Sequence, residues 1–438
     1  MPNPAVIDQT IHRTPLDPVA IAVFLIAFVA VAVVAARRPA YGIAALIVVV
    51  PFALYRDVGA TTITLPKVVL LANALGLVVG RRDASVLRGP AVALLLGCAI
   101  AVAAATGLSI AHAAYRGPAL RETLKALEYV LVFVTVAVAL DADADQRPIR
   151  VALALVLGVV SVLAIAQEWF GAPSGIWFHD RAVPRVAGPL EGPNQLAGFL
   201  GIALAMVSAY ALRRGPSRYE LAALGLGAMT LVLTISRTGL IASTIGLVVV
   251  FAIGAGTSRR SALLALGGGF LAGLGAIALV GYSATHNFGG VGLLGHFSTA
   301  AEAEKPGTVG NRSELWHAAF VLWRRHPLFG IGAGNFELEL GLAGYPKLHT
   351  HANSLYIQSL VEGGIPLALA TLALALAPIV RFARGPFSEP LVAGAFAASI
   401  GLGLHQIFDL LVFYPKVGDL WWIVLALGAV RFDVQRRG

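Results

Sequence analysis

Long apolar runs separated by short polar connectors recur along almost the whole chain and limit it to a membrane-spanning helical bundle. A helix that crosses the hydrocarbon core of a bilayer needs about 20 predominantly apolar residues. Thirteen segments approach this length, at residues 18–36, 40–55, 62–80, 89–111, 120–140, 148–170, 190–212, 219–235, 239–256, 261–282, 353–380, 388–413 and 416–431. Only 13% of the 438 residues are charged, against roughly 25% in soluble domains. We therefore predict an all-α polytopic membrane protein with about 12 transmembrane helices, because several segments are short.

Arginine doublets in alternate connectors predict which helix ends face the cytoplasm, where Lys and Arg accumulate. The doublets are Arg37-Arg38, Arg81-Arg82, Arg213-Arg214, Arg259-Arg260 and Arg436-Arg437. These connectors and the C-terminus are predicted to be cytoplasmic. Thirteen spans would put the N-terminus outside, and twelve would put it inside. The polar N-terminus lacks the pattern of a signal peptide, so we expect the first apolar run to be retained as a span. The net charge of +9 reflects this loop bias, so no nucleic-acid partner is expected.

One connector is far longer than the usual connector, and we expect it to lie outside. It divides the chain into three predicted parts: residues 1–282 with about ten candidate spans, the external segment 283–352, and the C-terminal transmembrane helices 353–438. An amphipathic helix is predicted to begin at Asn311 inside this segment, with Glu314 completing a capping box. It is predicted to end at His326 and to lie on the bilayer surface or over the bundle.

Solitary cations in the outside connectors are not explained by topology, and they are candidate ligands for an anion. Arg185 precedes a Pro- and Gly-rich approach to the seventh segment, and Asn194 lies near the start of that segment. Arg237 lies in a connector with almost no loop, and Arg312 lies in the first turn of the predicted external helix. A guanidinium group matches phosphate oxygens, and helix N-termini attract anions. The alternatives are solvated or snorkelling side chains and internal salt bridges.

The stretch KLHTHANS, at the outer end of the eleventh segment, contains Lys347, His349 and His351. Histidine exchanges a proton near neutral pH and suits a general base. The two histidines are two residues apart, so one is expected to face the site and the other solvent. The alternative is that they are only surface or capping residues. Lys347 is a candidate substrate contact.

Other motifs indicate less. The lone Cys98 excludes a disulfide framework and a cysteine metal site. The Asp-rich residues 141–145 are interpreted as a solvated cytoplasmic loop, and no outside carboxylate cluster suits a hard cation, so neither a metal nor a cofactor is predicted. The glycines of residues 329–336 follow no strand and predict a tight turn rather than a dinucleotide loop. His405 and Asp409, four residues apart in the twelfth segment, are either functional or paired with each other.

Taken in order, these motifs resemble the O-antigen ligase and O-antigen polymerase superfamily over approximately residues 150–370. The resemblance rests on Arg185-x-x-Gly188 with Pro193-Asn194, Ser236-Arg237, Asn311-Arg312-x-x-x-Trp316, HPLFGIGAGNF and HANSLYIQSLVEGG. The family often has His-Asn directly before the Tyr-Leu-Gln of this helix. Here Asn353-Ser354 occupies that place, and His351 lies two residues earlier. The base is therefore His351 or His349.

The resemblance implies a metal-independent, inverting glycosyltransferase of the all-helical membrane type, without a cofactor. Its donor would be a glycan on undecaprenyl diphosphate. Its acceptor would be a sugar hydroxyl of the lipid A core, at the periplasmic face of the bacterial inner membrane. Substrate contacts would come from Arg185, Asn194, Arg237, Arg312 and Lys347. The same motifs fit an O-antigen polymerase or a protein-glycosylating ligase. An anionic-lipid transporter is disfavoured, because it would need paired discontinuous helices in related halves.

Overall fold

The structure is a computed structural model that describes residues 17–285 and 312–437, apart from residues 53, 59–60, 143–144, 172–173, 179–180, 255–258 and 347. The α-helices are α1 (Pro18–Arg37), α2 (Pro39–Val49), α3 (Leu65–Val79), α4 (Pro90–Leu108), α5 (Arg116–Ala142), α6 (Arg147–Phe170), α7 (Pro193–Arg214), α8 (Arg218–Leu233), α9 (Arg237–Ile253), α10 (Arg259–Thr285), α12 (Arg312–Trp323), α13 (Phe336–Glu339), α14 (Leu355–Phe382), α15 (Pro390–His405) and α16 (Pro415–Arg437). Short 3-10 turns cover Ser85–Arg88, Ser109–His112 and Leu340–Ala343.

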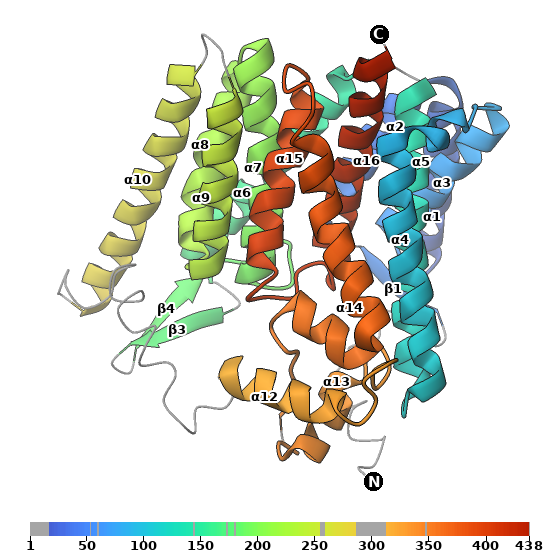
Figure 1. The fold of residues 1–438 in the computed structure, drawn as a ribbon. Coiled ribbons are helices and arrows are strands. Elements are labelled where there is room, and N and C mark those ends of the chain that lie inside the picture. Colours follow the sequence, from blue (N-terminus) through green and yellow to red (C-terminus); the bar gives the residue numbers. More distant parts are fainter. Residues whose placement is uncertain are drawn as a thin grey trace.

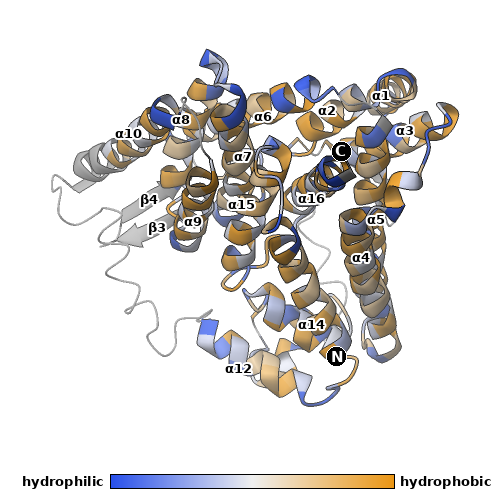
Figure 2. Cartoon of the chain, turned by 45° about the horizontal axis from the view of Figure 1, so that its top comes forward, coloured by the Kyte–Doolittle hydropathy of each residue, from blue (hydrophilic) through white to orange (hydrophobic). Residues whose placement is uncertain are grey.

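Each of the thirteen apolar segments contains a helix of the described chain. Six helices are long and apolar enough to cross a membrane: α1, α4 with the turn after it, α5, α6, α7 and α14. Four more helices, α2, α3, α9 and α15, are apolar but shorter. Hydrophobic residues dominate the helices, and hydrophilic residues gather at their ends (Figure 2). An all-α, multi-pass membrane fold is thus confirmed in general form, and the exact number of spans stays a prediction.

Local sequence signals explain where many helices begin. Proline occupies the first position of six of them, at Pro18, Pro39, Pro90, Pro193, Pro390 and Pro415. Its fixed φ suits a helix, and its missing N–H costs nothing there. Polar N-caps add to this signal. The Asp17 carboxylate accepts the N–H of Ala20 at 2.7 Å, and Ser217 with Glu220 forms a complete capping box at α8.

The two sets of connectors lie at opposite ends of the bundle, as the alternating doublets predict (Figure 1). At one end Arg82 donates to the carbonyl of Ala36 at 2.8 Å. At the same end, Arg150 pairs with Glu220 at 2.6 Å. The end of α16 lies there too, where Arg436 donates to the carbonyl of Arg384. Which end faces the cytoplasm remains the prediction made from the arginines.

Helix α7 occupies the centre of the bundle, since 94% of its most apolar 18-residue stretch is buried. Small residues let the neighbouring helices approach closely, as is common between membrane helices. A Cβ on Gly246 of α9 would lie 3.1 Å from the carbonyl oxygen of Ala397 in α15, and one on Gly401 would lie 3.0 Å from that of Ala242. This close approach packs α9 against α15, and both helices pack against α7.

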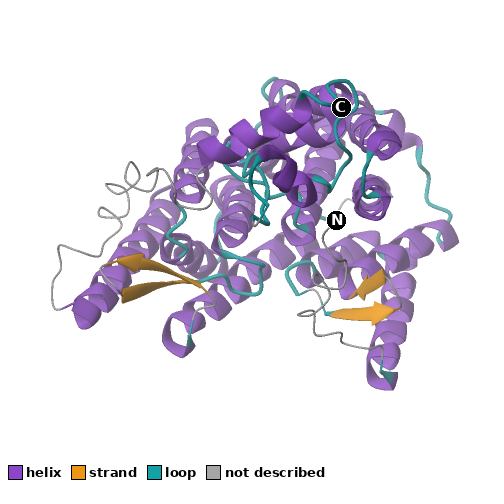
Figure 3. Ribbon diagram, turned by 90° about the horizontal axis from the view of Figure 1, so that it is seen from below, coloured by secondary structure: helices purple, strands orange, loops and turns teal. Residues whose placement is uncertain are grey.

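Two β-hairpins, which the sequence reasoning did not predict, lie apart at the end of the bundle opposite the arginine doublets (Figure 3). In one, β1 (Tyr55–Val58) pairs with β2 (Thr61–Thr64), and in the other, β3 (Ser174–Phe178) pairs with β4 (Arg181–Arg185). Both hairpins are antiparallel. The predicted irregular approach to α7 therefore begins only after Arg185, since residues 181–185 are paired in a strand.

The described part of the segment 283–352, which is predicted to be external, lies at the same end as the hairpins (Figure 1). Helix α12 is described from Arg312, so the predicted start at Asn311 and its capping box lie outside the described residues. The helix ends at Trp323, three residues before the predicted end at His326. It buries Leu315, Ala318, Ala319 and Leu322, and it packs against α14.

Candidate functional site

Three helix N-termini carry the polar residues that the sequence singled out as anion ligands. Asn194 is the second residue of α7, Arg237 the first of α9, and Arg312 the first described residue of α12. The positive ends of helix dipoles and their free N–H groups favour anions. Arg185, at the end of β4, joins this group, because its Nη2 donates to Asn194 Oδ1 at 3.0 Å.

Electrostatic interactions link the three arginines. Arg185 also donates from Nε to the carbonyl of Thr234 at 2.9 Å, which holds it beside the connector that precedes α9. Burial lowers the pKa of the Arg185 guanidinium, Asp409 opposes this shift, and nearby Arg237 adds to it. Arg237 lies in turn within electrostatic range of Arg312. The structure thus brings Arg185, Arg237, Arg312 and Asn194 together, as the anion hypothesis requires.

The connection between α15 and α16, residues 406–414, lies beside this cation cluster. Arg312 donates from Nε to the carbonyl of Phe408 at 3.2 Å. Burial raises the pKa of Asp409, whereas Arg312, Asn194 and Arg185 favour its charged form. His405 and Asp409 do not lie on one helix, as their four-residue spacing suggested, because α15 ends at His405 and Asp409 lies in the connection.

His351 packs against the last two residues of the 406–414 connection, away from Phe408 along the chain. Its ring packs 4.5 Å from the ring of Phe413 and 6.4 Å from that of Tyr414, measured between centroids. Burial lowers the pKa of His351, and Lys125 acts in the same direction, while Glu337 and Glu122 oppose it. A lowered pKa keeps the imidazole neutral near pH 7, which is the form that can accept a proton.

His349 differs from His351 in its surroundings. Its side chain is 60% exposed, and its Nδ1 lies 3.8 Å from a carboxylate oxygen of Glu337. The expectation that one histidine faces the site and the other solvent fits this arrangement. Lys347 lies outside the described residues.

A buried polar chain links the His351 segment to α14. Gln358 accepts the N–H of Ala352 at 2.8 Å, directly after His351. Its amide donates to Glu362 at 2.8 Å, and the same carboxylate oxygen of Glu362 accepts the N–H of Phe336 at 3.1 Å. The Trp316 indole donates to the carbonyl of Ala352 at 3.0 Å. Ala352 is therefore held on both sides, which limits how far His351 can move.

The glycine motif of residues 329–336 is more than the predicted tight turn, because it interlocks with a kink in α14. Gly330 has φ 69° and Gly364 has φ 64°. The N–H groups of Ile331 and Gly332 donate to the carbonyls of Val361 and Glu362 at 3.0 and 2.9 Å. A Cβ on Gly330 would meet the backbone of Glu362, and a Cβ on Gly364 would meet the carbonyl of Leu328. Glycine is thus required on both sides of the contact.

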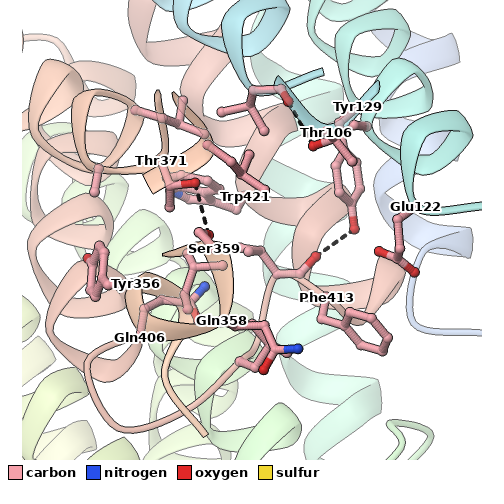
Figure 4. A pocket seen from close by; sticks show the side chains of 18 of the residues that line it. Thr106, Glu122, Tyr129, Tyr356, Gln358, Ser359, Thr371, Gln406, Phe413 and Trp421 are labelled. Carbon is pink, nitrogen blue, oxygen red and sulfur yellow. Dashed lines mark hydrogen bonds between the residues drawn. The ribbon is translucent and has the colours of Figure 1, made fainter. Parts of the chain in front are cut away.

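Two cavities lie in this region, and His351 lines the outer one. The outer one has a volume of about 620 Å³, and its lining includes Arg121, Glu122, Glu337, His349, His351 and Phe413. The inner one, about 130 Å³, lies between α4, α5, α14 and α16 and shares Glu122, Glu362 and Phe413 with the outer one. Figure 4 shows this inner cavity, with Glu122 and Tyr129 facing the 406–414 connection. Tyr129 donates to the carbonyl of Val412 at 2.8 Å.

The residues from α5 were missed by the sequence reasoning. Lys125 donates to the carbonyl of Phe413 at 2.9 Å and lies 3.7 Å from the centroid of its ring. It also pairs with Glu122 at 2.6 Å. A signal was present, since ionisable residues in the outer half of an apolar segment are functional candidates. The contacts of these α5 residues with residues 406–414 could not be predicted from the sequence.

Within the described residues, no group of three or more His, Cys, Asp or Glu side chains is arranged to hold a metal ion. Metal independence stays a prediction for experiment.

Comparison with protein families gives one match, which covers part of the candidate site. Residues 222–372 match the family model described as O-antigen ligase. The matched region includes Arg237, Arg312, both histidines and the glycine motif, whereas Arg185 and Asn194 precede it. A comparison with curated proteins gives no match.

Proposed function

We propose that this chain, of which residues 222–372 match the O-antigen ligase family model, transfers a glycan from undecaprenyl diphosphate to a sugar hydroxyl of the lipid A core. The observation that carries this proposal is the arrangement around the 406–414 connection. Arg312 contacts it at the carbonyl of Phe408, with Arg237 and Arg185 in electrostatic range of one another, and the neutral imidazole of His351 packs against it at Phe413. The reaction takes place at the periplasmic face of the bacterial inner membrane.

In the proposed mechanism the cation cluster binds the diphosphate of the donor. Arginine forks pair with phosphate oxygens, and their effect is larger in a site with few waters. His351 accepts the proton of the acceptor hydroxyl. The hydroxyl oxygen bonds to the anomeric carbon while the bond from that carbon to the phosphate oxygen breaks. Undecaprenyl diphosphate leaves with the bonding electrons. Attack opposite the leaving group inverts the anomeric configuration, which suits a base and a cation cluster held at different residues of one connection.

The O-antigen polymerase and the protein-glycosylating ligase remain alternatives, because they would use the same donor and the same groups. They differ only in the acceptor. No geometric feature of the described residues favours either of them over the lipid A core ligase.

Deletion of the gene tests the assignment. Loss of a ligase should leave bare lipid A core and accumulate lipid-linked polymer, whereas loss of a polymerase should leave core that bears a single repeat. The purified protein should also transfer glycan in excess chelator. Activity that vanishes with chelator and returns with Mg²⁺ would contradict the metal-independent mechanism.

A further inference from the structure

We propose that the outer cavity beside His351 is the acceptor subsite and that it selects an uncharged, hydroxyl-rich sugar; this inference rests on the proposed function. The cavity opens where α5 begins and is bordered by α13 and by the segment that carries the histidines. Its volume of about 620 Å³ falls in the usual range for small-molecule sites.

The position of the cavity assigns it to the acceptor rather than to the donor. His351 lines it directly, so a hydroxyl group bound there lies next to the base. None of Arg185, Arg237 and Arg312 is among its lining residues. The groups proposed to bind the diphosphate lie instead near the earlier part of the 406–414 connection, where Arg312 contacts the carbonyl of Phe408. The two substrates would thus approach the reacting atoms from different sides.

The lining of the cavity suits sugar hydroxyls. Carboxylates of Glu122 and Glu337 accept hydrogen bonds, and the guanidinium group of Arg121 donates them. A hydroxyl both donates and accepts, so it can pair with either kind of group. The Phe413 ring adds an apolar surface.

The charges in the lining act against an anionic acceptor group. Glu122 is already paired with Lys125, whereas Glu337, among the described residues, pairs with the exposed imidazole of His349 at 3.8 Å. A phosphate placed beside Glu337 would meet like charge, which disfavours binding. The acceptor sugar at this position is therefore expected to be unphosphorylated.

Kinetics of the full-length protein in nanodiscs test this assignment. The acceptor is lipid A core from a strain without O-antigen, and the donor-side probe is undecaprenyl diphosphate alone. Glu337→Ala should raise the acceptor KM about tenfold, the loss expected for hydrogen bonds to one charged group. The affinity for undecaprenyl diphosphate should stay within about twofold, because the arginines are untouched. The acceptor KM of Glu337→Gln should lie between the values of Glu337→Ala and the wild type. Asp141→Asn, at the exposed opposite end of α5, is the matched control.

Four results separate the inference from the proposed function. An unchanged acceptor KM in Glu337→Ala, or a weakened affinity for undecaprenyl diphosphate, would overturn the acceptor subsite. Acceptor freed of phosphate by aqueous hydrogen fluoride should have an equal or lower KM, and a higher KM would overturn the preference for an uncharged sugar. By contrast, wild-type affinity for undecaprenyl diphosphate in Arg237→Ala would contradict the proposed function itself.

Discussion

His351 and His349 are separated by one residue, yet their environments give them different expected roles. Replacement of His351 by Ala should reduce turnover by about 10²–10⁴-fold, the usual contribution of general base catalysis. His349→Ala should be milder, since that side chain is 60% exposed. Turnover of transfer by the purified protein checks both. A double alanine variant with wild-type turnover would remove the histidines from the mechanism.

The pH dependence of transfer gives a second test of His351. A base must be neutral to accept a proton, so the rate should fall as pH drops through its pKa. Burial lowers the pKa of His351 from its ordinary value of 6.5, which places the acidic inflection below that pH. The rate profile between pH 4.5 and 8 should show this inflection in the wild type and lose it in His351→Ala. An inflection above pH 6.5 that persists in the variant would assign the proton to another group.

The arginines are expected to act through the leaving group. Arg185→Ala and Arg237→Ala should each lower the transfer rate by about 10²–10³-fold, as for loss of one preorganised donor in a site of developing charge. Lysine should rescue only in part, because it lacks the planar fork. The readout is transfer with protein levels matched, and Arg218→Ala, exposed at the other end of the bundle, is the control. Near-normal transfer by either alanine variant would take that arginine out of the diphosphate site.

At the scale of elements, the contact between the glycine motif and the kinked α14 positions the site. Gly330→Ala should destabilise the protein, because φ 69° is strained for alanine and its Cβ would meet the backbone of Glu362. Gly344→Ala is a matched control: it has φ 96° but nothing within 4 Å of an added Cβ. Thermal unfolding should therefore show a larger loss of Tm for Gly330→Ala. Equal losses would mean that backbone strain alone, and not the interlock, explains the effect.

At the scale of the whole molecule, the orientation in the membrane decides whether the site meets periplasmic substrates. The test uses a Cys98→Ser background, which removes the lone cysteine. Leu342→Cys, at a site that is 55% exposed beside α13, should react with an impermeant thiol reagent in intact spheroplasts. Arg218→Cys should react only after permeabilisation. The reverse pattern would place the candidate site in the cytoplasm.

Local sequence signals determined the fold class, because each helix satisfies its own backbone hydrogen bonds and needs only an apolar run and its caps. The same runs placed thirteen of the fifteen described α-helices, and the solitary cations of the outside connectors pointed to Arg185, Arg237 and Arg312 as candidates. The β-hairpins were not predicted, because strands of four or five residues are too short to show a clear alternation of apolar and polar residues. Two local features were predicted incompletely. His405 and Asp409 do not lie on one helix, and the glycine motif forms a contact with α14 in addition to a turn.

Tertiary structure alone decided which histidine is enclosed and which residues share its cavity. Those choices depend on contacts across long stretches of chain. Lys125 of α5 reaches the carbonyl of Phe413, 288 residues away, and Asn335 accepts the N–H of Tyr115, 220 residues away. Sequence spacing cannot report such contacts, because the bundle brings helices together by packing of small residues and kinks rather than by order in the chain. The contacts of Arg312 and of His351 with the 406–414 connection could therefore be recognised only in the tertiary structure.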